Sequence, residues 1–143
     1  MTTTIAHIGI TVTDIERTCE FYAKYFGFER DYALLFDEDF VRESAALYRE
    51  PDGVFSDMRM LLSPDGVRLE LFRFSNVEPG GPVVWHKTGL THIALRVKGL
   101  PELYERMKAD GVEFFEPMKV RLSDGGHWIF LKDPEGNLVE LLD

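Results

Sequence analysis

Two histidines and two glutamates stand at matching places when the two halves of the chain are laid on each other. Aligning His7 with His92 places HIGITVTDIERTCEFY on HIALRVKGLPELYERM, and aligning SPDGVRLELF with DPEGNLVELL places Glu70 on Glu140. Two imidazoles and two carboxylates form a ligand set that suits a borderline divalent cation. The two negative charges would balance a 2+ ion, which removes the repulsion between buried carboxylates.

Strand alternation predicts that these four side chains share one face. Apolar residues alternate with His7 in HIGITV and with Glu70 in RLELF, and the second half repeats the pattern around His92 and Glu140. Because successive side chains of a strand point to opposite faces, all four project away from the helices. If the two modules pair into one curved sheet, that face is concave. We therefore predict one divalent ion per chain (Zn, Ni, Co, Mn or Fe) held by these four residues.

Each half of the chain has the pattern of one strand, one helix and three strands. The first helix is expected to begin at a capping box of Thr13 and Glu16 and to end at Gly27, and the second has Pro101 in its first turn and ends at Gly111. A Pro-Asp-Gly or Pro-Glu-Gly turn then joins two strands in each half. The predicted fold is α+β, with paired βαβββ modules forming a curved mixed sheet around the metal site.

The length favours one domain over residues 1–143, built from two modules. Module 1 covers about 5–75 and module 2 about 90–143, and a segment rich in Gly and Pro at 76–82 links them. The first module has 15 more residues between its His and its Glu than the second. These extra residues predict an inserted helix at about 37–50, which could cover the site as a lid.

Composition narrows the classes of partner. Sixteen basic and 25 acidic residues give a net charge of −9, which opposes a nucleic-acid or anionic-membrane partner. The one cysteine excludes an intrachain disulfide framework and fits a reducing compartment. The N-terminal residues have no basic head and no apolar signal core, so we expect a cytoplasmic protein. A small molecule is the expected substrate, with no nucleic acid or membrane as partner.

The motifs resemble those of the vicinal oxygen chelate superfamily, which includes glyoxalase I, methylmalonyl-CoA epimerase, extradiol dioxygenases, fosfomycin-resistance enzymes and bleomycin-binding proteins. The most specific segments are HIGITVTDIERTCEFYAKYFGF, HIALRV and DPEGNLVELL, and the resemblance covers nearly the whole chain. It implies paired βαβββ modules that enclose a metal, with ligands matching His7, Glu70, His92 and Glu140 one by one. It also implies a homodimer, an arrangement that buries free sheet edges.

The resemblance also bears on the type of reaction. A complete His, Glu, His, Glu set is similar to that of glyoxalase I and the epimerases, whereas extradiol dioxygenases use two His and one Glu. It implies a lyase, isomerase or epimerase in which Glu140 or Glu70 takes a proton next to a metal-chelated carbonyl. Thr11 and Phe74 stand where glyoxalase I has an Arg and an Asn, so glutathione is not the expected substrate. A CoA thioester needs several cations that converge, and it stays open because the sequence does not show whether five candidates do so: Arg59, Arg68, Arg73, Lys87 and Arg96.

Two further classes of function remain open at this point. One is an Fe(II)-dependent extradiol-type dioxygenase, in which His7, His92 and Glu140 form a facial triad and Glu70 is a labile fourth ligand. The other is a non-catalytic protein that binds a small molecule such as an antibiotic.

Five further residues are weighed as substrate contacts. Thr11 and Phe72 share the face of the proposed ligands, which makes them pocket candidates. His127 is a third candidate, with a surface or core position as its alternative. For Tyr48 and Arg42 on the inserted helix we expect a solvated position, and substrate contact is the alternative.

Overall fold

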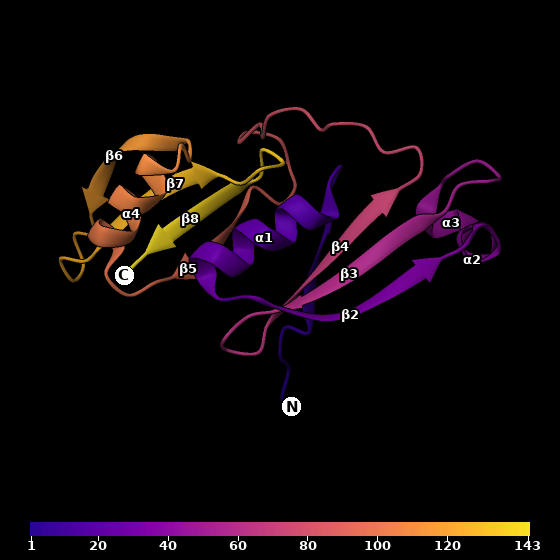
Figure 1. Cartoon of the computed structure of the whole chain (residues 1–143), viewed down its shortest axis with the longest axis horizontal. Coiled ribbons are helices and arrows are strands. Elements are labelled where there is room, and N and C mark those ends of the chain that lie inside the picture. Colours follow the sequence, from indigo (N-terminus) through magenta and orange to yellow (C-terminus); the bar gives the residue numbers. More distant parts are fainter. The chain divides into compact units, whose positions relative to one another are not determined.

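The computed structural model covers residues 1–143 and divides into two compact units, residues 1–79 and 80–143 (Figure 1). Each unit contains its own four-stranded mixed sheet and a long helix. The predicted α+β class and the paired βαβββ modules are thereby confirmed. The organisation of residues 1–143 as one domain stays a prediction.

The first unit has its sheet in the order β1-β4-β3-β2, with β1 parallel to β4 and the other pairs antiparallel. Its buried core lies between the sheet and α1, where Leu69 and Leu71 of β4 and Tyr22 of α1 are at most 2% exposed. The elements are β1 (His7–Thr11), α1 (Ile15–Phe26), β2 (Glu29–Phe36), α2 (Glu38–Glu43), α3 (Ala45–Tyr48), β3 (Ser56–Leu62) and β4 (Arg68–Phe74).

The second unit repeats this topology in the order β5-β8-β7-β6. Leu100 and Met107 of α4 and Leu131 of β7 are completely buried and form the centre of its core. None of the helices in either unit combines the length and the apolar composition that crossing a membrane requires. The elements are β5 (His92–Arg96), α4 (Leu100–Ala109), β6 (Phe114–Val120), β7 (His127–Lys132) and β8 (Leu138–Leu142).

The start of α1 corrects the predicted capping box by one residue. Asp14, not Thr13, is the N-cap, and its carboxylate accepts a hydrogen bond of 3.0 Å from the main-chain N–H of Arg17. Both residue types cap helices well, so the choice between neighbours depends on where the backbone turns. The predicted end of α1 at Gly27 and the proline Pro101 in the first turn of α4 are both confirmed.

Both hairpin turns form where the sequence predicts them. Gly66 and Gly136 have φ angles of 91° and 84°, values that favour glycine over residues with a Cβ. In each turn a side-chain oxygen, from Ser63 or from Asp133, accepts a 2.9 Å hydrogen bond from the main-chain N–H four residues later. These turns fix the register of the hairpins that carry Glu70 and Glu140.

The predicted inserted helix at about 37–50 is two short helices in the structure. Asp37 caps α2 by accepting a 2.9 Å hydrogen bond from the N–H of Phe40, and Ser44 ends α2 and begins α3. α3 in turn ends at Arg49, whose φ of 56° is left-handed. The Ser44 side chain makes no hydrogen bond that caps α3. Both helices lie beside the end of β2 (Figure 1).

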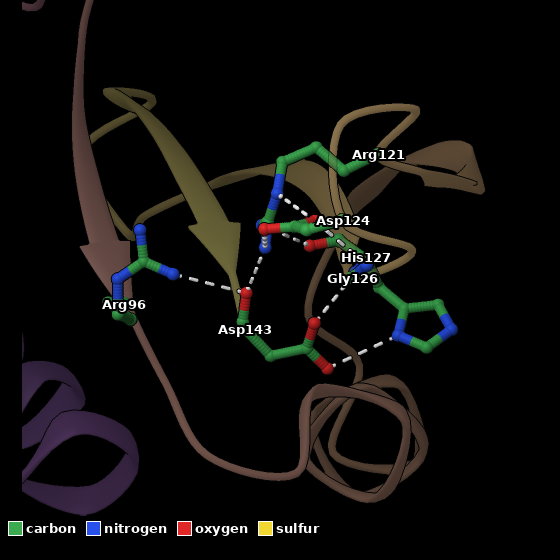
Figure 2. A network of polar contacts seen from close by, with 6 residues as sticks. All are labelled: Arg96, Arg121, Asp124, Gly126, His127 and Asp143. Atoms are coloured by element: carbon green, nitrogen blue, oxygen red, sulfur yellow. Dashed lines mark hydrogen bonds and ion pairs between the residues drawn. The ribbon is translucent and has the colours of Figure 1, made fainter.

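A polar network closes the loop between β6 and β7 against the end of β8 (Figure 2). Arg121 makes two hydrogen bonds to the Asp124 carboxylate, of 2.9 and 2.8 Å. Arg121 and Arg96 both donate to the main-chain oxygen of Asp143, at 2.5 and 3.1 Å. The Asp143 carboxylate accepts a 2.6 Å hydrogen bond from the main-chain N–H of His127, and its other oxygen lies 3.2 Å from Nδ1 of the same residue.

This network predicts a pH-dependent contribution from Asp143. The hydrogen bond from the His127 main chain lowers the pKa of the Asp143 carboxyl. Its stabilising effect is therefore present above the pKa of an unfolded aspartate, about 3.9, and is lost as the pH falls through the lower folded value. Asp143→Asn, which resembles the protonated form, should lower the urea midpoint at neutral pH, and the gap to the wild type should close in acid.

The matched control is Glu105→Gln, which removes an exposed carboxylate from α4 of the same unit. It should leave the urea midpoint unchanged across the same pH range. A gap between Asp143→Asn and the wild type that stays constant down to the acid limit would contradict the assigned role.

Candidate functional site

The first unit brings His7 and Glu70 into contact on adjacent parallel strands. The register pairs Gly9 with Glu70 and Thr11 with Phe72, so side chains of β1 and β4 that share a face are neighbours. His7 Nε2 lies 3.0 Å from Glu70 Oε2, and the two side chains are 45% and 15% exposed. The glutamate is therefore held in the sheet, while the histidine stays accessible from solvent.

The second unit repeats this contact at the equivalent positions. Ala94 pairs with Glu140 in the parallel register of β5 and β8, and His92 Nε2 lies 3.2 Å from Glu140 Oε2. Nδ1 of His92 is 2.8 Å from the hydroxyl of Thr91, and its ring meets Phe130 edge to face with centroids 4.9 Å apart. These neighbours fix the imidazole so that its other nitrogen is directed at the carboxylate.

Each pair lies at ion-pair distance, with N···O separations of 3.0 and 3.2 Å. Two donors about 2.1 Å from one octahedral ion would also lie about 3 Å apart, so the pairs are compatible with metal ligation. The structure contains no group of three or more His, Cys, Asp or Glu side chains arranged to hold a metal. Each unit thus contributes one nitrogen and one oxygen donor, and the four-ligand site stays a prediction.

A pocket of about 840 Å³ opens in the first unit in front of the His7–Glu70 pair. The two pocket candidates from this module, Thr11 and Phe72, both line it together with His7 and Glu70. Tyr48, for which we expected a solvated position, is half-buried and lines the pocket as well. The remaining lining residues are Phe36, Leu47, Glu50, Phe74, Asn76, Val77 and Glu78.

Five aromatic side chains form a connected group, here called the aromatic wall: Phe36, Phe40, Tyr48, Phe72 and Phe74. All of them except Phe40 line this pocket. Phe36 stacks on Phe40 with centroids 4.6 Å apart and lies 5.6 Å from Phe72. Phe74 is 6.2 Å from Phe72 and 5.9 Å from Tyr48. Alternation with Glu70 could have predicted the faces of Phe72 and Phe74, whereas the approach of Tyr48 and Phe40 depends on how α2 and α3 fold back.

The charged residues of the pocket are acidic apart from the titratable His7. Glu50 and Glu78 line it in addition to Glu70, and no Lys or Arg is among the lining residues. Glu50 accepts a 2.7 Å hydrogen bond from the Asn76 side chain, which holds the carboxylate at the pocket. No pattern in the sequence identifies these two glutamates, because both belong to loops.

The structure does not bring His127 and Arg42 to the candidate site. Phe130 of β7 pairs with Glu140, so the residues of β7 at odd positions, His127 included, lie on the opposite face of the sheet from that glutamate. His127 belongs instead to the network around Asp143 (Figure 2). Arg42 forms an exposed ion pair with a neighbouring residue of α2 and does not line the pocket.

Comparison with known sequences finds relatives that are named lactoylglutathione lyases. A lactoylglutathione lyase of Pseudomonas putida is 31% identical over 151 residues, a match that covers 95% of this chain and 82% of that protein. A lactoylglutathione lyase of Schizosaccharomyces pombe is 26% identical and matches over 95% of this chain. This chain spans 46% of the length of the yeast protein.

Solved structures share the fold over the whole chain. A glyoxalase family protein from Bacillus cereus has a TM-score of 0.80 and 17% identity, covering 99% of this chain and 94% of that one. A fosfomycin resistance protein from Listeria monocytogenes, in complex with Mn(II) and a dihydroxypropylphosphonic acid, has a TM-score of 0.65 and 24% identity, covering 99% and 92%. The model of one family matches residues 4–141, and the chain therefore belongs to the Glyoxalase/Bleomycin resistance protein/Dioxygenase superfamily.

Proposed function

We propose that the protein is a metal-dependent lyase or isomerase, epimerases included, that removes a proton next to a metal-chelated carbonyl of a small molecule. One observation carries the proposal: the same His and Glu contact recurs at the same strand register in both units, at 3.0 and 3.2 Å. We assign His7, Glu70, His92 and Glu140 as ligands of one divalent ion per chain, Zn, Ni, Co, Mn or Fe. A bound ion would supply Lewis acidity to two neighbouring substrate oxygens.

The protein side chains have separate tasks in this proposal. His92 is oriented by Thr91 and by the ring of Phe130, which leaves its Nε2 as a fixed donor. Glu140 or Glu70 would act as the general base once that carboxylate has loosened from the metal. Because His127 lies on the opposite face of the sheet from Glu140, it has no part in the reaction.

Glu70 favours proton chemistry over oxygen chemistry. Its Oε2 lies as close to His7 as that of Glu140 lies to His92, which supports a fourth protein ligand. If the ion is octahedral, four protein ligands would leave it two positions, enough for a chelating substrate and none for dioxygen unless a carboxylate leaves. An Fe(II)-dependent extradiol-type dioxygenase, in which Glu70 leaves the metal, is the second candidate, and a non-catalytic antibiotic-binding protein is the third.

Glutathione and CoA are not favoured as parts of the substrate. Thr11 and Phe74, the two residues that depart from the glyoxalase I pattern, both line the pocket, and no lining residue is a Lys or an Arg. The arginines of the first unit that could bind a CoA phosphate each form an ion pair with a carboxylate and lie outside this pocket; they are Arg59, Arg68 and Arg73.

We further propose a cytoplasmic homodimer. Cys19 is free and buried, and burial raises the pKa of its thiol, which keeps it unreactive in a reducing compartment. The outer strands β2 and β6 leave apolar side chains at the surface, among them Leu35 at 61% and Val120 at 58% exposure. A second copy that covers such an edge would remove it from solvent.

Light scattering should therefore give about twice the monomer mass of 16.5 kDa, and the monomer mass at micromolar concentration would refute the dimer.

Metal content tests the ligand assignment. Elemental analysis of protein purified without chelator should find one divalent ion per chain. His92→Ala and His7→Ala should each weaken metal binding by about tenfold or more, because each removes one of four donors. His127→Ala is the matched control and should retain the wild-type content. Equal metal in all four proteins would exclude this site.

Turnover of the hemithioacetal of methylglyoxal and glutathione tests the choice of substrate. Weak or absent formation of the thioester, followed by its ultraviolet absorbance, is expected because the pocket offers no cation to the glutathione carboxylates. Both relatives are named lactoylglutathione lyases, so the absence of this activity would separate the substrate of this chain from theirs. Turnover at the rate of a dedicated glyoxalase would show that glutathione is held by other residues.

Isotope exchange separates the proton mechanism from the dioxygenase. Candidate 2-hydroxy-ketones, 2-oxoaldehyde adducts and acyl thioesters are incubated in D₂O, and deuterium at the α-carbon is followed, in parallel with oxygen uptake on catechols. Exchange is expected, and Glu140→Gln should reduce it by roughly 10²-fold or more while some metal is retained. Oxygen uptake with ring cleavage and without α-exchange would favour the Fe(II) dioxygenase.

A further inference from the structure

We propose that the pocket of the first unit binds a planar ring of the substrate that is uncharged or cationic, and that it rejects rings bearing a carboxylate or a phosphate. This inference rests on the proposed function, because it concerns the part of the substrate next to the chelating oxygens. It adds the chemical class of that part. Two independent observations support the inference: the aromatic wall favours a planar ring, and the acidic lining disfavours an anionic one.

The aromatic wall is continuous with the proposed ligands. Phe72 follows Glu70 by two residues on the same face of β4, and it pairs with Thr11 of the neighbouring strand β1. Both residues line the pocket together with His7. A ring held against Phe72 therefore lies beside the His7–Glu70 pair, where chelating oxygens on the same molecule would have to be. The volume of about 840 Å³ leaves room for such a molecule.

The pocket has exposed apolar surface that a ring would cover. Leu47, which lines the pocket beside the wall, is 73% exposed. Phe36 stacks on Phe40 at 28° and lies tilted at 46° to Phe72. Aromatic rings prefer offset-stacked and edge-to-face neighbours, and the rings of the wall are inclined to one another rather than parallel. A planar ring gains such contacts, and a flexible aliphatic chain does not.

The charge of the lining decides which rings are accepted. Glu50 and Glu78 contribute two carboxylates in addition to Glu70, which is assigned to the metal, and no Lys or Arg lines the pocket. Glu50 is held in place by Asn76, so its charge stays at the pocket. A carboxylate or phosphate on the ligand would face like charges, whereas an ammonium group would face these carboxylates and the faces of aromatic rings.

Three ring probes of equal size test the proposal without any metal. Benzylamine, benzyl alcohol and benzoate are titrated into the ¹⁵N-labelled full chain, stripped of metal, and amide shifts are followed by NMR. Propylamine, which has the charge without the ring, is the control probe. Ring probes should shift the amides of Thr11 and Val77, both in the pocket lining. Benzylamine should bind at least about fivefold more tightly than benzoate, with benzyl alcohol between them.

Variants separate the two parts of the proposal. The double variant Glu50→Gln, Glu78→Gln should bring the affinities for benzylamine and benzoate to within about twofold of each other, whereas Glu20→Gln on α1 should change neither. Phe72→Leu should weaken all three ring probes by several-fold, and Phe115→Leu, a change of an exposed ring in the second unit, should weaken none. Each variant's own amide spectrum shows whether it is folded.

The outcomes distinguish this inference from the proposed function. Binding of benzoate as tight as that of benzylamine, or probe shifts confined to residues outside the pocket, would overturn the inference. Zn²⁺ binding, measured by calorimetry on the same protein, is read separately. Zn²⁺ binding without ring selectivity would contradict only the proposed ring site. Ring selectivity without Zn²⁺ binding would contradict only the proposed metal-dependent function.

Discussion

Parallel pairing of the first and last strands of each unit is the interaction on which the site depends. β1 lies beside β4 and β5 beside β8, so a histidine and a glutamate that are far apart in sequence become neighbours on one face. The strands between them contribute the hairpin whose turn fixes the register. A shift of one residue in that register would turn Glu70 from the pocket toward α1 and bring Leu69 or Leu71 out of the core. The buried leucines therefore hold the ligand geometry in place.

This dependence explains which features could be predicted from the sequence. Strand faces follow from alternation and from the internal repeat, so the faces of His7 and Glu70 were predictable, and the same rule applied to β7 would have separated His127 from Glu140. The cap of α1 was not, since Thr13 and Asp14 are both suitable and only the backbone path decides. The break at Ser44, and with it the position of Tyr48, depends on packing between α3 and β4 that no local pattern encodes.

The pocket combines an aromatic surface, which comes partly from β4, with an acidic charge, which comes partly from loops. Phe72 and Phe74 come from the strand that carries Glu70, whereas Glu50 and Glu78 come from loops. Loops vary without disturbing the core, so they can change the charge of the lining while the sheet keeps the ligands fixed. This division of tasks is consistent with a superfamily whose members share a fold and differ in substrate.

The proposed metal site takes its four ligands from two like pairs, one in each unit. A His and Glu pair supplies two donors, fewer than a divalent cation requires, and the structure contains one such pair in each unit. Neither pair alone accounts for tight binding. The affinity for the metal would therefore depend on both modules at once. Loss of a ligand in one unit would lower the affinity for an ion that the ligands of the other unit also bind. Binding would also offset the mutual repulsion of Glu70 and Glu140, because a 2+ charge balances two carboxylates brought together in one site.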